Sequence, residues 1–555
     1  MKLTGADILV RTLIEQGCKT VFGYPGGQIL NVYDSLYKYS GEITHVLAAH
    51  EQGAAHAADG YARATGKVGV VIATSGPGAT NLVTGIATAM LDSVPMVAIT
   101  GNVGSDSIGR DSFQEIDITG ITLPITKHNY FVGSVDDLAD TLREAFRIAS
   151  SGRPGPVLVD VPKDVQLACC EYLPRPSAMP DEKFPAKDVR IAQAAELINS
   201  STRPYVYVGG GVISGDACKE ALALADTIDA PVGCSLMGIS AISTDNPRFL
   251  GMQGMHGHYA SSMAFSKSDC IIALGGRFND RVTGDRAKFN ENKRIVHIDV
   301  DGSELGKNAD IAVGLRGDVK LTLVKLLKSI KQKKLPLWQE EIAALKRTET
   351  SFLCDKGHLN PHSAMWALNS FIGENTPVAT DVGQHQMWAA QELKFSRPRR
   401  FISSGGLGTM GFGMGAAIGA AIGAGERSVL VTGDGSFGMN LNELATAVTY
   451  NIPLVILILN NGVLGMVRQW QTLFFGERYS NTVLGRKTDF PLLAKAFGAA
   501  GESVDTLEAL NAALKRAFAC NGPYLIDCSV DKDEMVFPMV PPGASVENLI
   551  LKRGQ

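Results

Sequence analysis

The chain has 555 residues, too many for one hydrophobic core, so we expect two to four domains. A hydrophobic share of 45%, a charged share of 19% and a formal net charge of −4 are ordinary for a soluble globular protein, and they exclude the electrostatic footprint of a nucleic-acid or anionic-membrane partner. The nine cysteines include no C-x-x-C pair, which indicates a reducing compartment rather than a disulfide framework.

The N-terminus has the pattern of an amphipathic helix rather than that of a signal peptide. In MKLTGADILVRTLIEQG the apolar residues Ile8, Leu9 and Leu13 recur at helical spacing, and Thr4 with Asp7 predicts a capping box. No apolar run reaches the roughly 18 residues that span a bilayer. We therefore expect a soluble, cytoplasmic protein.

Three α/β units follow one another along the chain, and their strands end in Gly, Pro, Ser or Thr, as strands do before the helices of a doubly wound parallel sheet. The first unit spans residues 1–170, a Pro-rich linker occupies 172–188, the second unit spans 188–335, the third spans 357–540, and 541–555 form a tail. The predicted strands are TVFGYPG, THVLAAH, VGVVIAT, PMVAITG and PVLVDVP in the first unit, YVYVGG, DCIIALGG and RIVHIDVD in the second, and PVATDVG, SVLVTGDG, PLVILILNN and YLIDCSV in the third.

The stretch GDGSFGMNLNELATAVTYNIPLVILILNN predicts a strand ending at Asp434, a helix over MNLNELATAVTYN, and a strand ending at Asn461. A right-handed crossover brings both strand ends to one edge of the sheet, where doubly wound folds bind ligands. One carboxylate oxygen, one amide oxygen and a backbone carbonyl, for which Val463 is the candidate, suit octahedral Mg²⁺. The glycines around Asp434 and the following helix offer N–H groups to an anionic diphosphate. Taken alone, Gly-Asp-Gly also fits a tight turn in which the aspartate caps a helix.

With its paired asparagines, this stretch resembles the cofactor motif of the thiamine-diphosphate-dependent decarboxylases and carboligases. The resemblance implies that Asp434, Asn461 and the backbone of Val463 hold Mg²⁺ against the cofactor diphosphate, and that Met410 props the cofactor in a bent conformation. Met410 fits a core methionine equally well. The cofactor contacts that the resemblance implies are Gly26, Gly27, Gln384, His385, Gly408, Met410, Gly433, Gly435, Ser436 and Met466.

In that superfamily a glutamate after the second strand protonates the aminopyrimidine ring of thiamine diphosphate, and AAHEQGAAHAADGYAR puts Glu51 at that position. The simpler alternative is an acidic residue that the helix dipole favours in a first turn. Because Glu51 and the diphosphate motif lie in different units, the resemblance implies sites between subunits of a homodimer or homotetramer.

Three further stretches, FGYPGGQILNVYD, DSFQEIDITGITLPITKH and GMVRQWQ, resemble the catalytic large subunits of acetohydroxyacid (acetolactate) synthases almost end to end. These enzymes decarboxylate pyruvate on thiamine diphosphate and ligate the hydroxyethyl unit to pyruvate or 2-ketobutyrate, for valine, leucine and isoleucine biosynthesis. The resemblance assigns Arg281 to the acceptor carboxylate and Trp470 to the extra methyl group of 2-ketobutyrate. It assigns Phe113, Gln114 and Lys163 to the substrate channel, although a core aromatic, a turn amide and a solvated lysine explain each one alone.

The domain organisation implied is an N-terminal pyrimidine-binding domain, a central FAD-binding-type domain and a C-terminal thiamine-diphosphate and Mg²⁺ domain. FAD is largely structural in this family, because the reaction has no net redox step. Gln28 and Asn279 depart from the alanine and aspartate that the family usually has. The implied FAD contacts are Arg153, Gly210, Leu236, Gly254, Met255, His256, Gly275, Arg277, Asn279, Asp299, Asp318 and Val319.

Two other readings remain open: a flavin-independent catabolic acetolactate synthase, and a non-catalytic assembly or regulatory protein of the same fold. The second would be expected to lose Glu51, Asp434 or Asn461, and all three are present. A small regulatory subunit is a possible partner. A nicotinamide dehydrogenase is disfavoured because no clean G-x-G-x-x-G opens a helix, and a P-loop is excluded as a motif because GK[ST] is missing.

Overall fold

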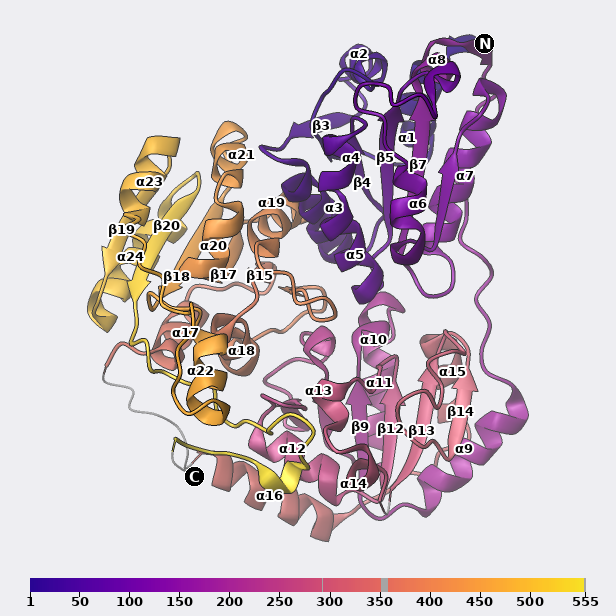
Figure 1. Ribbon diagram of the computed structural model, residues 1–555. Coiled ribbons are helices and arrows are strands. Elements are labelled where there is room, and N and C mark those ends of the chain that lie inside the picture. Colours follow the sequence, from indigo (N-terminus) through magenta and orange to yellow (C-terminus); the bar gives the residue numbers. More distant parts are fainter. Residues whose placement is uncertain (292, 351–357, 554–555) are drawn as a thin grey trace.

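The computed structural model describes residues 1–291, 293–350 and 358–553, and three six-stranded parallel sheets dominate it (Figure 1). The predicted α/β class with three doubly wound sheets is confirmed. Residue 357, the predicted start of the third unit, and the last two residues of the tail lie outside the described residues. The other domain limits stay predictions. Among the described helices, none has both the length and the hydropathy that crossing a bilayer requires.

The first sheet has the strand order β3-β2-β4-β5-β7-β6, and the strands predicted in the first unit are confirmed. A two-stranded antiparallel pair, β1 with β8, closes the domain. The strands are β1 Lys2–Thr4, β2 Thr20–Gly23, β3 Thr44–Leu47, β4 Gly69–Ala73, β5 Met96–Asn102, β6 His128–Phe131, β7 Pro156–Pro162 and β8 Cys169–Glu171; the helices are α1 Gly5–Glu15, α2 Leu30–Lys38, α3 Glu51–Thr65, α4 Pro77–Asn81, α5 Val83–Asp92, η1 Ser105–Ser107, α6 Ile118–Thr122, η2 Leu123–Ile125, α7 Val135–Ser150 and α8 Lys163–Leu167.

The capping box predicted for α1 forms only in part. Thr4 Oγ1 accepts from Asp7 N at 3.2 Å, so the N-cap is confirmed. The Asp7 carboxylate, however, accepts from Ser35 Oγ at 3.0 Å and Lys38 Nζ at 2.7 Å of α2. A full capping box would need the Asp7 carboxylate to accept from the backbone N–H of Thr4. Because Asp7 is buried between the two helices, pairing with the charged lysine stabilises its carboxylate better than that bond would.

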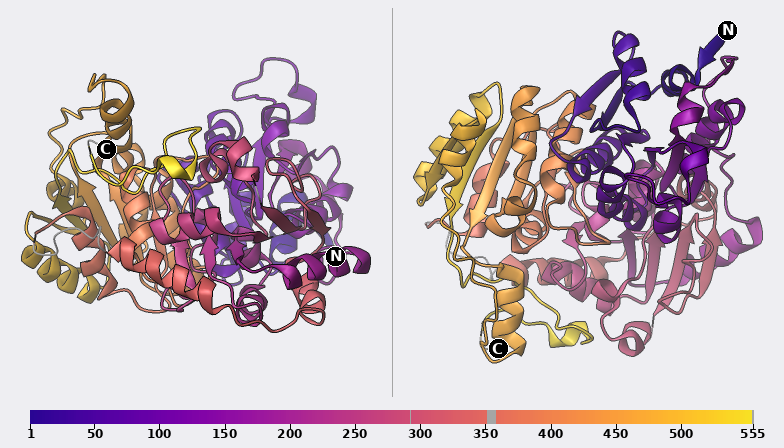
Figure 2. Two further views of the ribbon diagram at one scale, coloured as in Figure 1. Left: turned by 90° about the horizontal axis from the view of Figure 1, so that it is seen from below. Right: turned by 45° about the horizontal axis from the view of Figure 1, so that its top comes forward.

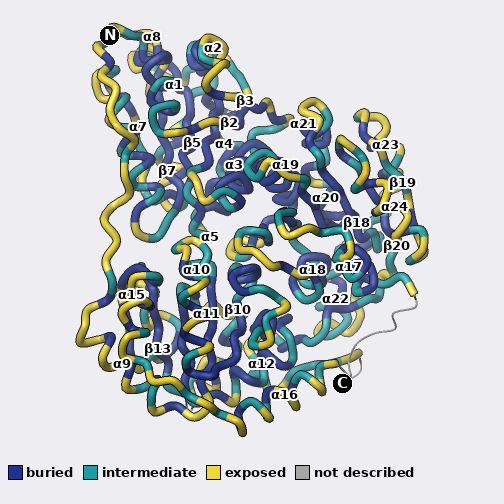
Figure 3. Tube along the Cα trace, turned by 180° about the vertical axis from the view of Figure 1, so that it is seen from behind, coloured by how far each residue is buried: buried dark blue, intermediate teal, exposed yellow. Residues whose placement is uncertain are grey.

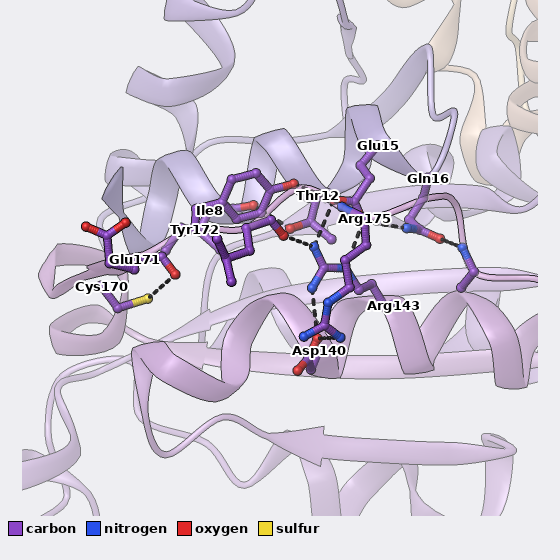
Figure 4. A network of polar contacts seen from close by, with 12 residues as sticks. Ile8, Thr12, Glu15, Gln16, Asp140, Arg143, Cys170, Glu171, Tyr172 and Arg175 are labelled. Carbon is purple, nitrogen blue, oxygen red and sulfur yellow. Dashed lines mark hydrogen bonds and ion pairs between the residues drawn. The ribbon is translucent and has the colours of Figure 1, made fainter. Parts of the chain in front are cut away.

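A polar network anchors the start of the linker to the first domain (Figure 4). Arg143 Nε and Nη2 donate to the two oxygens of Glu15 at 2.7 and 2.8 Å. Tyr172 Oη and the Arg175 amide also donate to this carboxylate, at 2.7 and 2.9 Å. Burial alone would raise the pKa of Glu15, but these bonds outweigh it and lower that pKa to about 2. Beyond this anchor the linker is an exposed segment along one side of the molecule (Figure 3).

The central sheet has the order β11-β10-β9-β12-β13-β14, and the predicted strands are its β9, β12 and β13. Its middle strands are fully buried, as expected for a parallel sheet covered by helices on both faces. The strands are β9 Pro204–Val208, β10 Val232–Cys234, β11 Phe249–Met252, β12 Cys270–Leu274, β13 Arg294–Asp299 and β14 Val313–Arg316; the helices are α9 Asp188–Ser200, α10 Gly210–Ser214, α11 Cys218–Thr227, η3 Leu236–Gly238, α12 Tyr259–Lys267, α13 Asp280–Thr283, α14 Arg286–Asn290, α15 Val319–Leu327 and α16 Pro336–Thr350.

The third sheet has the order β16-β15-β17-β18-β20-β19, with β17 and β18 in its middle, and its predicted strands are confirmed. The single helix predicted over 439–451 is wrong: α20 begins at Asp434, and α21 follows after a break that includes Asn442, a residue type that competes with helical hydrogen bonding. The strands are β15 Val378–Thr380, β16 Phe401–Ile402, β17 Ser428–Gly433, β18 Leu454–Asn460, β19 Ala500–Val504 and β20 Tyr524–Ser529; the helices are α17 Pro361–Asn369, α18 Gln384–Glu392, α19 Phe412–Ala424, α20 Asp434–Asn440, α21 Glu443–Thr449, α22 Gly465–Phe474, α23 Phe490–Phe497, α24 Leu507–Ala519 and η4 Val546–Asn548.

The first and third domains join through the helix pair α3 and α19, which lie side by side (Figures 1 and 2). The backbones touch because glycines face the partner helix. A Cβ on Gly419 would lie 1.8 Å from Ala57 O, and a Cβ on Gly60 would lie 2.1 Å from Ala416 O. We call residues 403–411, which directly precede α19, the Met410 loop. Within one chain, the contact between α3 and α19 fixes the first domain against the helix that follows this loop.

Candidate functional site

A cavity of about 1450 Å³ lies where the three domains meet. It exceeds the roughly 300–1,000 Å³ of an ordinary small-molecule site, so it has room for more than one ligand. Residues of every domain line it, among them Arg153 of the first domain, Met255 of the central one, and Asp434 of the third.

At one wall of the cavity, the ends of β17 and β18 lie side by side, as the sequence predicts. The two strands are parallel neighbours with Gly433 opposite Leu459, so Asp434 and Asn461 both follow the carboxyl edge. Burial raises the pKa of Asp434 to about 6, and bonds from backbone N–H groups, including that of Asn461, partly offset this. Asn461 Oδ1 accepts from Val463 N at 3.1 Å, which turns the chain so that Val463 also lines the cavity.

This donor set suits one kind of metal. Among the described residues, no three His, Cys, Asp or Glu side chains cluster as a transition-metal site would require. One carboxylate, one amide oxygen and a main-chain carbonyl leave open positions for water and phosphate oxygens, which is the coordination that Mg²⁺ prefers.

Beside these strand ends, the first turn of α18 opens onto the cavity. Gln384 and His385 line it, and so do Gly435 and Ser436 at the start of α20. Burial lowers the pKa of His385 to about 3, so the ring is neutral, and its Nε2 is buried with no hydrogen-bond partner among the described residues. A Cβ on Gly433 would lie 2.9 Å from His385 Nδ1. An unpaired ring nitrogen and backbone N–H groups at one wall fit an oxygen-rich anionic ligand.

The remaining predicted cofactor residues of the third domain also line the cavity. Gly408 has φ +71°, which makes the Met410 loop turn sharply before α19. The side chain of Met410 lies 3.9 Å from the Cβ position of Gly435, directly beside the predicted diphosphate wall. Met466, in the first turn of α22, faces the same space.

Two residues predicted to bind substrate meet although they belong to different domains. The guanidinium of Arg281, on α13, lies 5.7 Å from the ring centroid of Trp470, on α22. Arg281 Nη1 also contacts Met255 Sδ at 3.6 Å. The Trp470 Nε1 atom is buried without a partner among the described residues. A half-exposed cation therefore sits over an indole on one wall of the cavity, a combination suited to a small carboxylate with an apolar tail.

The central domain contributes a glycine cradle. Gly211 N donates to Gly275 O at 2.9 Å, and a Cβ on Gly275, whose φ is +53°, would lie 2.6 Å from Gly211 Cα. Close by, His256 is buried with Nδ1 unpaired, and burial lowers its pKa to about 4. The predicted flavin contacts line this part of the same cavity: Arg153, Gly210, Leu236, Gly254, Met255, His256, Gly275, Arg277, Asn279, Asp299, Asp318 and Val319.

Three of those residues already have partners in the protein. Arg153 Nη1 pairs with Glu304 Oε1 at 2.9 Å. Asp318 caps α15 by accepting from Leu321 N at 2.9 Å. Asp299 accepts from Asp301 N at 2.8 Å, and burial raises its pKa to about 6. These bonds fix the side chains at the cavity wall before any ligand arrives.

Apart from Arg153, the predicted site residues of the first domain are not brought to this cavity. None of Gly26, Gly27, Glu51, Gln114 and Lys163 is among the described residues that line it. They gather instead at the carboxyl edge of their own sheet. Gly26 follows β2, Glu51 starts α3 after β3, and Lys163 starts α8 after β7.

Within this edge, close approaches link the residues to the turn after β4. Glu51 Oε2 accepts from Asn81 Nδ2 at 2.9 Å, and its Oε1 lies 3.2 Å from the Cβ position of Gly78. Gln114 has φ +63° and packs against Gly76. Its neighbour Phe113 is 83% exposed. The chain thus carries two half-sites, and of these only the one in the cavity lines that cavity within one molecule.

Sequence reasoning missed Arg63 and Asp92, which also line the cavity and whose side chains are almost fully buried. Asp92 ends an apolar helix and Arg63 lies near the end of α3, so neither follows a strand. No local pattern distinguishes them from surface charges, since their partners come from distant parts of the chain.

Models of thiamine pyrophosphate enzymes match all three units: the N-terminal TPP binding domain over residues 3–121, the central domain over 191–326 and the C-terminal TPP binding domain over 381–528. The chain is 46% identical to the acetolactate synthase isozyme 2 large subunit of Escherichia coli, covering 99% of this chain and 100% of that protein. It is 44% identical to a probable acetolactate synthase large subunit of Methanocaldococcus jannaschii, covering 99% and 95%. It is 45% identical to an acetolactate synthase of Mycobacterium leprae, covering 100% and 91%.

Proposed function

Because the chain belongs to the acetolactate synthase family of thiamine pyrophosphate enzymes, we propose that it joins two 2-ketoacids with loss of CO₂. Two pyruvates would give 2-acetolactate, and pyruvate with 2-ketobutyrate would give 2-aceto-2-hydroxybutyrate, both for branched-chain amino-acid biosynthesis in the cytoplasm. The observation that carries the proposal is one cavity that holds both the Asp434–Asn461 wall and the Arg281–Trp470 pair.

In this proposal Asp434, Asn461 and the carbonyl of Val463 hold Mg²⁺, and the first turns of α18 and α20 receive the diphosphate of the cofactor. The unpaired Nε2 of His385 supports this assignment, because a phosphate oxygen or its water shell would satisfy it. When bound, thiamine diphosphate supplies the electron sink that decarboxylation of a 2-ketoacid requires.

Arg281 binds the carboxylate of the acceptor 2-ketoacid. Its planar guanidinium can form two parallel hydrogen bonds to a carboxylate, and its position over Trp470 orients that fork. The Trp470 indole then packs against the alkyl group of the acceptor. A preference for the longer 2-ketobutyrate should amount to only about 1–3 kcal/mol, the usual value of one methylene group.

The central part of the cavity takes FAD in this proposal. Gly211 and Gly275 both line the cavity without a side chain, so a phosphate or ribityl chain can lie near their backbone, and the unpaired Nδ1 of His256 offers a polar contact. The reaction has no net redox step, so the flavin serves the architecture of the cavity.

Glu51 would hold a proton at the aminopyrimidine ring, but its own half-site does not face the cavity of its chain. We therefore assign Glu51, Gln114 and Lys163 to the site of a second subunit, in a homodimer or homotetramer. Phe113 beside Gln114 is 83% exposed in the single chain, so this proposal expects the second subunit to cover it. Two of the relatives are called large subunits, which supports a small regulatory subunit as a further partner.

The test is acetolactate formation from pyruvate by flavin-stripped protein with thiamine diphosphate and Mg²⁺, with and without added FAD. We expect formation that depends on all three additions. Formation without any dependence on FAD would favour a catabolic, flavin-independent synthase. No acetolactate under any of these conditions would overturn the proposal.

A further inference from the structure

The Met410 loop, residues 403–411, is held by the first domain of its own chain. At the C-terminal end of α5, Asp92 Oδ1 accepts from Gly406 N at 2.7 Å, and Oδ2 accepts from Gly405 N at 3.1 Å. Arg63 Nη1 donates to Ser403 O at 2.9 Å. These three bonds tie the backbone at the start of the loop to two side chains from far earlier in the sequence.

A fourth bond holds the other end of the loop. The hydroxyl oxygens of Thr88 on α5 and Thr409 lie 2.8 Å apart, and both residues are buried. Since the Thr88 hydroxyl donates to Thr84 O at 2.8 Å, the Thr409 hydroxyl is the donor of the shared bond. Thr409 directly precedes Met410, so α5 contacts the loop on both sides of Gly408 and immediately before Met410.

The contact contains a buried ion pair whose carboxylate also binds the loop. Arg63 Nη2 lies 2.9 Å from Asp92 Oδ2, with 9% and 0% of the two side chains exposed. Burying an ion pair gains little free energy by itself, because desolvation offsets the attraction. Both Asp92 oxygens also accept from loop backbone N–H groups, while Arg63 gives Nη1 to the loop at Ser403 O and Nε to Asp59 Oδ1 on its own helix. A Cβ on Gly406 would lie 2.8 Å from Asp92 Oδ1, so the glycine is needed for the carboxylate to come this near.

We propose that Asp92, with Arg63 and Thr88, is a positioning residue that sets Gly408 and Met410 against the thiamine diphosphate of the same chain. The inference rests on the proposed function and goes beyond it. The first domain would serve two sites: its Glu51 edge faces the site of a second subunit, and its α5 shapes the site of its own chain. Loosening the loop should therefore weaken and disorder cofactor binding while leaving the Arg281–Trp470 wall untouched.

The experiment compares Thr88→Val and Asp92→Asn with Thr12→Val as the matched control. Thr12 is as buried as Thr88, and its hydroxyl donates to Ile8 O at 2.7 Å in its own helix rather than to the Met410 loop. The readouts are the Kd for thiamine diphosphate with saturating Mg²⁺, the near-ultraviolet circular dichroism of the bound cofactor, and kcat and KM for pyruvate.

We expect Thr88→Val to raise the Kd for thiamine diphosphate about 3- to 10-fold, the effect of losing one neutral hydrogen bond. For Asp92→Asn we expect a rise of about 10- to 100-fold, because charge-assisted bonds are stronger. Both variants should change the cofactor dichroism and lower kcat while KM for pyruvate stays near the wild-type value. Thr12→Val should match wild type in every readout.

Wild-type Kd and dichroism in both folded variants would overturn the inference, and so would equal losses in Thr12→Val. If Asp92→Asn fails to fold, Thr88→Val decides, since it keeps both charges and nearly the same volume. The Kd for thiamine diphosphate and the dichroism of the bound cofactor can both be measured on protein that does not turn over substrate. A wild-type protein that binds the cofactor but makes no acetolactate would therefore contradict the proposed function and leave this test intact.

Discussion

At the scale of single residues, the contact between Arg281 and Trp470 shows how two distant motifs make one recognition surface. The indole lies under the guanidinium, 5.7 Å from ring centroid to Cζ, and its Nε1 has no partner among the described residues. Each residue alone fits a solvated cation or a core aromatic. Their meeting at one wall of the cavity is what supports a role in binding a short-chain acid.

Trp470→Leu should reduce the preference for 2-ketobutyrate over pyruvate as acceptor, because a smaller, non-planar side chain packs less well against the added methyl group. The loss should be about 1–3 kcal/mol in discrimination. The measurement is the ratio of the two products in competition. The control is Phe475→Leu, because Phe475 is an exposed aromatic residue just beyond α22. An unchanged ratio in Trp470→Leu would remove the residue from the acceptor site.

The carboxylate of Glu15 gives a prediction for acid stability. Its pKa in the folded state is about 2, below the value of 4.5 for a free glutamate, because Arg143, Arg175 and Tyr172 bond to the charged form. A lowered pKa contributes stability that is fully present above about pH 4.5 and is lost as the pH falls toward 2.

Glu15→Gln should therefore lower the melting temperature at pH 7, and the difference from wild type should shrink at pH values below about 4.5. Melting temperatures at matched ionic strength from pH 7 to pH 3 would measure this. Glu508→Gln, at an exposed glutamate on α24, is the control. A difference that stays constant over this range would contradict the assignment.

At the scale of elements, the α3–α19 pair makes a sharp packing prediction. Alanine normally favours a helix over glycine by about 1 kcal/mol, yet the added methyl group of Gly419→Ala would lie 1.8 Å from Ala57 O. The helices must separate, and we expect a net loss of about 1–3 kcal/mol. Thermal melting would measure it, with Gly133→Ala as control, since its Cβ would meet nothing within 4 Å. A more stable Gly419→Ala would refute the close packing.

Elements were predictable where the pattern was local. The central strands of all three sheets were found from short apolar runs ended by turn residues, and the ends of β17 and β18 fell at one edge as the crossover rule requires. Short strands such as β10 and β16 were not predicted, because two or three residues carry no period. The break between α20 and α21 was missed, and so was the partner of Asp7, which lies on another helix.

The site residues also divide into those that a local pattern predicts and those that it does not. Asp434 and Asn461 could be found from strand ends and donor chemistry, whereas Glu51, Arg281 and Trp470 needed the family resemblance. Arg63 and Asp92 escaped both, because their partners are backbone atoms of a loop more than 300 residues away in sequence.

At the scale of the whole molecule, the arrangement of half-sites leads to the central claim. The cavity holds the proposed metal, diphosphate, flavin and acceptor residues, while Glu51, Gln114 and Lys163 lie at a separate edge of the same chain. A closed symmetric dimer can bring the edge of each chain to the cavity of the other. The protein would then be active only as an assembly, with each site drawing on two chains.

The most direct measurement mixes two variants that should each be inactive, Glu51→Gln and Asp434→Ala. Co-expressed with separable tags, they form mixed dimers in which one site has both defects and the other has neither. We expect each variant alone to make almost no acetolactate, and random mixing to restore about a quarter of wild-type activity. Purified mixed dimers that remain as inactive as either parent would contradict a site shared between subunits.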